Sequence, residues 1–409
     1  METTDLHILV SGGGIAGNAV ALQLIRAGFR VTVVERAVGP RPGGQAVDLR
    51  GPSREVAERM GLLPGIRARQ LDERGMAYVD RDGREYARMP TAIFEGKGPV
   101  ADIEITRGDL AEVLLAALAE AGGDLDYRFG DHIEALDQDA AGVEVAFASG
   151  RRERFDLVIG ADGVHSATRR LAFGPEERFS TYLGGYTSYF TMPAPADIEP
   201  GWMTMHSLPG VTIGLRPDVD PATCKAFVVL RVPADPALRR DVAAQQALLR
   251  AELADAGWRA PEILAALPDA ADFYFDELAR IDVPELAAGR VTLVGDAGYC
   301  GSPLSGMGTA MALVGAYLLA GALTADPNDL VGAVRRYARD ITPFLDQAKK
   351  LPGGGIAMMV PASGFGVRMA KVMARAMVSK PMRPLVIKMM SHTDDFELPT
   401  YPTAATPPA

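Results

Sequence analysis

The sequence predicts an α/β fold in which a domain of parallel strands is interrupted by an inserted antiparallel-sheet domain and followed by a C-terminal helix. An apolar run over residues 6–10 leads into a glycine turn over 12–17. A helical pattern over 15–27 and a second apolar run over 31–35 follow, so the chain opens as a βαβ unit. Between 183 and 281 longer strands appear, which indicates a second sheet.

These patterns predict that the first domain is discontinuous in sequence. The expected elements of the insertion are strands over 185–192, 202–215, 224–232 and 272–281 and one helix over 242–256. The predicted ranges are 1–72, 101–182 and 282–350 for the first domain, 73–100 and 183–281 for the inserted substrate-binding domain, 351–398 for a C-terminal helical segment, and 399–409 for a disordered tail rich in Pro and Thr.

Composition limits the class of protein and its partners. The chain has 409 residues, 48% hydrophobic and 23% charged, enough for a large core and more than one domain. A net charge of -10 argues against nucleic acid or an anionic membrane as the main partner, so we expect a small molecule. Only Cys224 and Cys300 are present, which predicts no metal cluster and a reducing compartment. With no secretory signal pattern at the N-terminus, we expect a cytoplasmic protein, monomeric or homodimeric.

Two apolar segments raise the question of a membrane. The run over 310–325 is shorter than the roughly twenty residues of a span and contains Gly315 and Gly321, so we expect a buried helix and no stable insertion. The Met-rich segment over 365–390 suits either an amphipathic membrane helix or a helix whose Met face packs on the domain junction. We favour the second, because Met fills irregular gaps.

The first glycine turn has the context of a dinucleotide site. Gly12, Gly14 and Gly17 allow a tight turn, close approach to a pyrophosphate, and close packing of helix on strand. The phosphates then meet the positive end of the helix that begins near Ile15. Glu35 ends the next strand, where a carboxylate binds ribose hydroxyls and disfavours a 2′-phosphate. This segment alone predicts FAD or NAD.

Two later segments decide between these dinucleotides. Residues 160–166, Gly-Ala-Asp-Gly-Val-His-Ser, and residues 295–308 each follow a predicted strand. An Asp after a strand, here Asp296, suits the hydroxyls of a ribityl chain, and Gly306 and Gly308 let backbone amides approach a flavin edge at a helix start. A ligand held at its pyrophosphate, ribityl chain and ring needs such distant contacts. The segments together predict FAD in a Rossmann-like FAD-binding domain.

The segments over 159–169 and 295–308 resemble group A flavoprotein monooxygenases of the p-hydroxybenzoate hydroxylase type. The likeness extends from about residue 6 to about 325 and is strongest to the tetracycline-inactivating branch, whose substrates are antibiotics from secondary metabolism. The chain departs from the family pattern at Gly298-Tyr299 and at Thr309. By the resemblance, Asp162 lies near the pyrophosphate, and Arg107 and Asp48 lie near the flavin. The predicted cofactor contacts are Gly12, Gly14, Ile15, Ala16, Gly17, Glu35, Arg36, Asp48, Arg107, Asp162, Asp296, Pro303, Gly306, Met307 and Gly308.

The resemblance also implies a reaction. NADPH or NADH reduces the flavin, O2 adds to form a flavin C(4a)-hydroperoxide, and one oxygen passes to an aromatic, phenolic or polyketide-like substrate. The flavin carries this chemistry, so we expect neither a protein nucleophile nor a metal, and the sequence shows no such arrangement. Two alternatives stay open on this scaffold: a reductase or desaturase that inserts no oxygen, and a non-catalytic redox sensor.

Substrate contacts are expected on the inserted sheet and on the flavin segment. Strand alternation places Met203 and Met205 on one face and His206 on the other, without showing which face meets the substrate. We select Tyr189, Met203, Met205 and Pro303, because a Met- and aromatic-rich surface suits an apolar, polycyclic or phenolic ligand.

Overall fold

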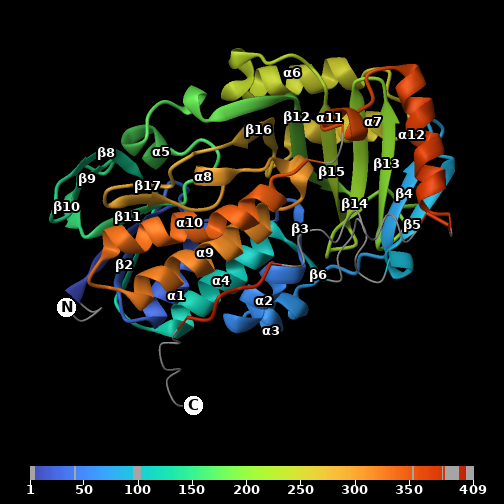
Figure 1. Ribbon diagram of the computed structural model, residues 1–409. Coiled ribbons are helices and arrows are strands. Elements are labelled where there is room, and N and C mark those ends of the chain that lie inside the picture. Colours follow the sequence, from blue (N-terminus) through green and yellow to red (C-terminus); the bar gives the residue numbers. More distant parts are fainter. Residues whose placement is uncertain are drawn as a thin grey trace.

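A computed structural model describes residues 5–40, 43–94, 103–351, 354–379, 381–382 and 396–401. A six-stranded sheet at one end and a seven-stranded sheet at the other form the two main parts (Figure 1). The first sheet has the order β17-β18-β11-β1-β2-β7 and is parallel except between β17 and β18. Its strands are β1 (His7–Ser11), β2 (Arg30–Glu35), β7 (Leu125–Phe129), β11 (Leu157–Gly160), β17 (Ala287–Ala288) and β18 (Val291–Leu293).

Both faces of this sheet are covered, which explains why its central strands are apolar throughout. One face carries the helices α1 (Ile15–Arg26), α4 (Arg107–Ala121), α9 (Gly308–Ala325) and α10 (Leu330–Ala348). The other face packs on a small antiparallel sheet of β8 (Ile133–Gln138), β9 (Val143–Phe147) and β10 (Arg152–Phe155). Helix α9 has the length and composition of a membrane span, but 78% of it is buried between its neighbours, so it is a core helix.

The second sheet joins strands from two distant parts of the sequence, in the order β16-β12-β15-β14-β13-β4-β5. Its strands are β4 (Gly75–Val79), β5 (Glu85–Pro90), β12 (Ser180–Pro193), β13 (Trp202–Leu208), β14 (Val211–Pro217), β15 (Thr223–Leu230) and β16 (Tyr274–Ile281). The single strand predicted over 202–215 is wrong: it is a hairpin that turns at Gly210, whose φ of 82° favours glycine. The helix predicted over 242–256 is also corrected, to α6 (Val242–Leu253) and a separate α7 (Ala260–Ala266).

The two faces of the second sheet meet different neighbours. Phe190, Met192 and Cys224 lie on the outer face, under α6 and α7. Met205 and Phe227 lie on the inner face and share a cluster with Leu304, which belongs to the first domain. Two short elements complete the junction, the antiparallel ribbon of β3 (Ala46–Leu49) and β6 (Ile103–Thr106) and the helices α2 (Gly51–Arg59) and α3 (Leu63–Ala68).

The C-terminal part differs from its prediction in two places. Tyr401, expected in a disordered tail from 399, packs against Tyr317 with ring centroids 5.6 Å apart and ring planes tilted by 60°, and it covers Gly321 of α9. The carbonyl of Pro399 accepts hydrogen bonds from Arg59 and from the Tyr317 hydroxyl, so this part of the predicted tail packs on the protein. The remaining part, 402–409, lies outside the described residues. The segment over 365–390 contains α12 (Gly364–Met377), preceded by α11 (Ile356–Met359), and 383–395 lie outside the described residues.

Candidate active site

The three predicted cofactor segments meet at one edge of the parallel sheet. They follow β1, β11 and β18, which are neighbours in that sheet, so their carboxyl ends lie side by side. A Cβ added to Gly12 would lie 2.5 Å from the carbonyl oxygen of Ala161, and one added to Gly295 would lie 2.8 Å from the Cβ of Ala16. The chain therefore needs glycine at both positions for the segments to approach.

The N-terminus of α1 is built to receive a phosphate group. A Cβ on Gly17 would lie 1.9 Å from the carbonyl oxygen of Gly12, so glycine lets the helix pack tightly on the turn. Gly14 is the N-cap, no side chain caps this end, and a Cβ on Gly14 would meet nothing within 4 Å. The first amides of the helix, at Ile15 and Ala16, thus border open space at the positive end of its dipole. This geometry fits a pyrophosphate.

Glu35 and Arg36 end β2 beside this turn. The Glu35 carboxylate accepts hydrogen bonds from the backbone N–H of Gly13 at 2.8 Å and of Ala37 at 2.7 Å. A carboxylate has about four acceptor positions, so two remain for ribose hydroxyls. Arg36 is exposed next to it.

Asp162 forms its hydrogen bonds with residues of its own loop. Its carboxylate accepts hydrogen bonds from the Ser166 hydroxyl and from both the backbone N–H (2.9 Å) and the hydroxyl (3.0 Å) of Thr168. Ser166 in turn caps α5 (Ala167–Ala172) by accepting from the backbone N–H of Arg169. Asp162 therefore shapes the loop that passes the phosphate site, a role that the sequence pattern does not distinguish from a ligand contact.

Arg169 fastens this loop to the third segment. Its side chain is fully buried and donates to the carbonyl oxygens of Ala297 at 2.9 Å and Val164 at 2.6 Å. It also pairs with Glu176 at 3.3 Å. Because Ala297 follows Asp296 directly, the position of Asp296 depends on this buried guanidinium.

Asp296 begins α8 (Asp296–Tyr299), shortly after β18 ends at the edge of the sheet where the segments meet. Burial raises the pKa of its carboxyl above the usual value, and the nearby Arg107 guanidinium partly opposes that rise. The backbone of Arg107 is tied to the 43–45 loop through a 2.9 Å hydrogen bond to the carbonyl of Gln45. A desolvated acceptor that lies near a cation suits the hydroxyls of a ribityl chain.

The turn before α9 forms the far wall of the site. Pro303, Gly306 and Gly308 are exposed in succession, and a Cβ on either glycine would meet nothing within 4 Å. Met307 is the N-cap of α9, and no side chain caps that helix end. These open backbone positions and the Asp296 carboxyl fit the ring and ribityl parts of FAD.

The predicted flavin residue Asp48 lies on β3, where it forms an ion pair with Arg50.

The inner face of the seven-stranded sheet carries the predicted substrate residues. Tyr189 and Met203 pack with buried Met205 in the same cluster as Leu304, the neighbour of Pro303. His206 points to the opposite face, where its ring nitrogens lie 3.1 Å from the carbonyl oxygens of Val79 and Ala256. The structure thus brings the four predicted substrate residues to one side of the junction.

A charged cluster at this junction escaped sequence reasoning. Arg216 at the end of β14 pairs with both Glu73 and Glu104, so it links the second sheet to the β3–β6 ribbon. Burial raises the pKa of Glu73, while Arg216 opposes the rise. Lys225, opposite Arg216 in the sheet, lies 3.1 Å from Asp218 and donates to the Thr191 hydroxyl at 2.6 Å. The sequence feature that could have predicted this cluster is the presence of charged residues at the ends of otherwise apolar strands.

His165 links the second segment to the second sheet. Its Nδ1 lies 3.1 Å from a Glu176 oxygen and its Nε2 lies 3.1 Å from an Asp276 oxygen. These hydrogen bonds, first to Asp276 and then to Glu176, raise the pKa of His165 to about 9. The imidazolium therefore joins β16 to the phosphate-side loop and is a structural contact in this conformation.

Two open cavities lie away from the three segments. One, of about 390 Å³, borders α12 and includes His206 and Lys371, and the other, of about 190 Å³, borders Trp258 and Arg88. Within the described ranges no group of His, Cys, Asp and Glu side chains is arranged to hold a metal ion.

Comparison with known proteins assigns the chain to a family. Residues 5–329 match the model of the FAD binding domain family. An uncharacterised protein of Mycobacterium tuberculosis is 42% identical, over 85% of this chain and 94% of its own length. A flavin-dependent monooxygenase of Legionella longbeachae is 37% identical, over 85% of this chain and 87% of its own length.

A solved structure extends the likeness to the whole fold. Tetracycline destructase Tet(55) is 33% identical and superposes with a TM-score of 0.80 over 98% of this chain and 100% of its own. The predicted fold class and family resemblance are thereby confirmed. This chain belongs to the FAD-dependent monooxygenase family.

Proposed function

We propose that this monooxygenase hydroxylates an aromatic, phenolic or polyketide-like small molecule, with NADPH or NADH as reductant and O2 as the oxygen source. The observation that carries the proposal is the shared cluster of Met205, Phe227 and Leu304. It joins the apolar face of the second sheet to the turn that borders the flavin segments. A flat apolar ligand at this junction would contact the sheet on one side and face the Pro303 turn on the other.

The chain's residues divide the work of binding between two walls. FAD, when bound, supplies the transfer of electrons from nicotinamide and of one oxygen atom to the substrate. Tyr189, Met203 and Met205 provide an apolar wall that excludes water. Lys225 and Arg216, each paired with carboxylates at the ends of the neighbouring strands, provide N–H donors for a substrate hydroxyl or enol.

The tetracycline destructases support the polycyclic part of this proposal. Tet(51) and Tet(55) are each 33% identical to this chain and cover nearly all of it, and their names state an action on tetracycline. Tetracycline combines fused rings with phenolic and enolic hydroxyls, which matches an apolar wall beside polar N–H donors.

The test is a turnover assay on the purified holoenzyme. Candidate phenolic polycycles are added with NADPH or NADH under isotopically labelled O2, and the products are analysed by mass spectrometry. The proposal expects ligand-stimulated oxidation of the nicotinamide and one labelled oxygen in the product. Nicotinamide oxidation that yields only peroxide with every phenolic polycycle would contradict the substrate class.

Two matched substitutions locate the substrate. Met205→Leu changes the inner face and Met192→Leu the outer face of the same sheet, and each swap costs less than about 1.5 kcal/mol of stability. We expect Met205→Leu to change KM several-fold and Met192→Leu to leave it unaltered. An equal response of both variants would show that the inner face does not bind the substrate.

A further inference from the structure

Helix α12 has a composition that the flavin site does not explain. Its sequence, Gly-Phe-Gly-Val-Arg-Met-Ala-Lys-Val-Met-Ala-Arg-Ala-Met, contains three cations and no carboxylate. The side that faces the protein is narrow: Ala374, Met377 and Val378 pack with Tyr78 and Met89 of the second sheet. The helix lies at the outer edge of the molecule, at the end far from the six-stranded sheet (Figure 1).

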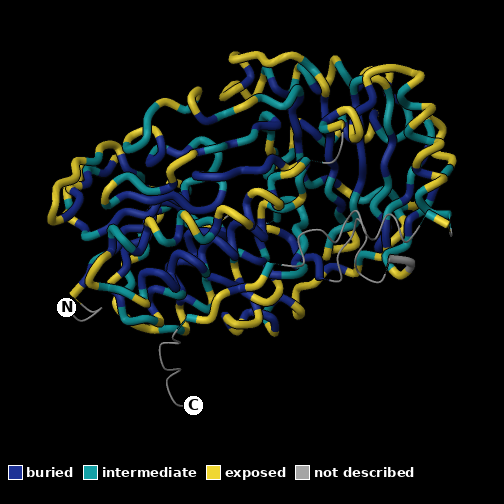
Figure 2. Tube along the Cα trace, in the orientation of Figure 1, coloured by how far each residue is buried: buried dark blue, intermediate teal, exposed yellow. Residues whose placement is uncertain are grey.

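The opposite side of α12 is an apolar stripe. Its members recur at helical spacing, which places them on one face. Their exposed fractions are 72% for Phe365, 45% for Met369, 59% for Val372 and 49% for Met373. Figure 2 shows this outer edge as a mixture of exposed and intermediate residues. The prediction that the Met face packs on the domain junction is therefore wrong, because Met369 and Met373 are exposed and the helix packs on β4 and β5 at the outer edge of the second sheet.

The cations occupy the flank between the buried side and the stripe. At 100° per residue Lys371, Arg375 and Arg368 follow one another around the helix, and the stripe begins just beyond them. Lys371 lies 5.0 Å from the centroid of the Tyr86 ring, and Arg375 donates to the Tyr86 carbonyl. In the described part of the chain none of the three forms a salt bridge with a carboxylate.

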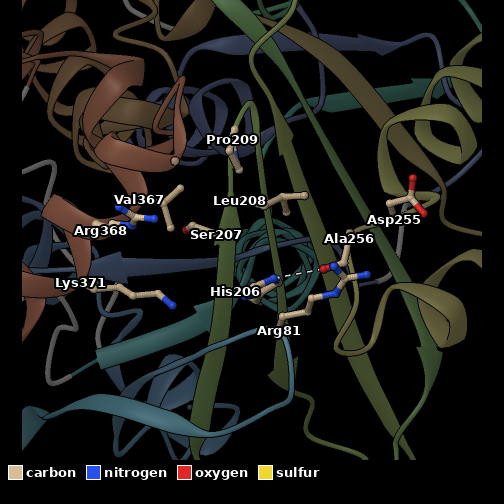
Figure 3. A pocket seen from close by; sticks show the side chains of 11 residues that line it. Arg81, His206, Ser207, Leu208, Pro209, Asp255, Ala256, Val367, Arg368 and Lys371 are labelled. Atoms are coloured by element: carbon tan, nitrogen blue, oxygen red, sulfur yellow. Dashed lines mark hydrogen bonds between the residues drawn. The ribbon is translucent and has the colours of Figure 1, made fainter.

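A cavity of about 390 Å³ opens on the same flank (Figure 3). Arg368 and Lys371 line it from α12, and Arg81 lines it from the β4–β5 turn on the other side. Asp255 is the one carboxylate in its lining. Asp80 lies nearby; the backbone N–H of Arg84 is the main cause of its lowered pKa, and Lys371 adds to that lowering. Three cations against one lining carboxylate make this flank locally positive on a chain whose net charge is -10.

We propose that α12 docks on an anionic lipid surface, with its stripe in the acyl boundary and a headgroup phosphate beside the cations of the cavity. Local charge complementarity argues for this occupant: headgroup phosphates would lie beside the cavity cations, whereas the distant net charge of -10 is screened beyond about 8 to 10 Å. A second copy of α12 would instead place the same cations against them. An interfacial helix of this kind has cations along its polar flank and Phe or other apolar residues opposite. Docking is peripheral and reversible, because α12 has 14 residues and is too short to span a membrane.

Vesicle co-sedimentation of the holoenzyme tests the proposal. We expect binding to vesicles that contain phosphatidylglycerol, weak binding to phosphatidylcholine alone, and release by salt. Each cation near the surface contributes about fivefold in affinity, so Arg368→Gln/Lys371→Gln/Arg375→Gln should weaken binding about 100-fold. Val372→Ser/Met373→Ser should weaken it at least about tenfold.

A matched control separates local from total charge. Arg54→Gln/Arg67→Gln/Arg335→Gln removes the same charge from exposed positions of the first domain and should bind vesicles as the parent does. Flavin absorbance of each variant confirms that it is folded. The proposal fails if the parent does not bind anionic vesicles, or if the control variant loses binding as the Arg368→Gln/Lys371→Gln/Arg375→Gln variant does. It also fails if Val372→Ser/Met373→Ser binds as tightly as the parent. Concentration-dependent dimerisation abolished by Val372→Ser/Met373→Ser, without vesicle binding, would assign the stripe to self-association.

Discussion

Asp162 and Asp296 follow neighbouring parallel strands and are both half-buried, yet their carboxyl groups have opposite surroundings. Asp162 accepts hydrogen bonds from Ser166 and Thr168 of its own loop. Asp296 is desolvated, and its pKa is raised by burial, with Arg107 as the opposing charge. The difference indicates that the Asp162 carboxylate maintains its loop and that the Asp296 carboxyl is placed to bind a ligand. Equal motifs therefore do not imply equal roles.

The largest expected effect comes from the residue that connects the two loops. Arg169→Met should lower the free energy of unfolding by about 3 to 5 kcal/mol, because it leaves Glu176 short of a buried partner and frees the Ala297 carbonyl. Thermal unfolding of apo- and holoprotein measures this. A holoprotein with unchanged flavin content and stability would show that the loops position themselves independently.

Asp296→Asn should weaken the binding of FAD without lowering the stability of the apoprotein. Loss of hydrogen bonds to a charged acceptor should weaken FAD binding about 10- to 100-fold in a fluorescence titration. Because the pKa of Asp296 is raised in the folded state, the parent apoprotein loses stability as the pH rises through that pKa. Asn does not ionise, so the Asp296→Asn apoprotein should be at least as stable as the parent at neutral pH. A destabilised apoprotein with normal FAD affinity would reverse the assignment.

Asp162→Asn should show the converse pattern at smaller size. An Asn side chain replaces one of the two accepting oxygens by a donor, so either the Ser166 hydroxyl or the Thr168 donors lose their acceptor at a cost of about 1 to 3 kcal/mol. Chemical denaturation of the apoprotein measures that loss, and Ser166→Ala provides an independent disruption of the same loop. If Asp162→Asn weakens FAD binding without destabilising the apoprotein, Asp162 contacts the cofactor directly.

His165 should give the smallest effect, and one that depends on pH. Its pKa, about 9 in the folded protein, exceeds the usual 6.5, so its contribution is complete below pH 6.5 and disappears as pH rises through about 9. His165→Gln should therefore unfold more easily than the parent at pH 6 and equally at pH 10. A stability difference that does not vary with pH would exclude the ion pairs with Glu176 and Asp276 as its cause.

Sequence reasoning succeeded where the determinants were local. The glycine turn, the helix after it and the carboxylate of Glu35 lie within one βαβ unit, so spacing alone places them correctly. The break at Pro209-Gly210 was readable too, since this dipeptide marks a turn, but continuous apolar character on both sides hid it.

The rest depends on contacts between distant parts of the chain. Arg169 reaches Ala297 and Arg216 reaches Glu73 across more than a hundred residues, and no local pattern encodes such pairs. Tyr401 is ordered because Gly321 leaves room for its ring on α9, which a Pro- and Thr-rich tail does not suggest.

The position of β18 in the parallel sheet affects how the protein is made. Leu157–Gly160 pairs on one side with Val291–Leu293, which the ribosome adds more than a hundred residues later. Until then β11 is an open edge of apolar residues on a partly synthesised chain, and such edges recruit other strands. Slow translation or chaperone binding across the inserted domain would therefore govern yield, and heterologous expression should improve when β11 is shielded during that interval.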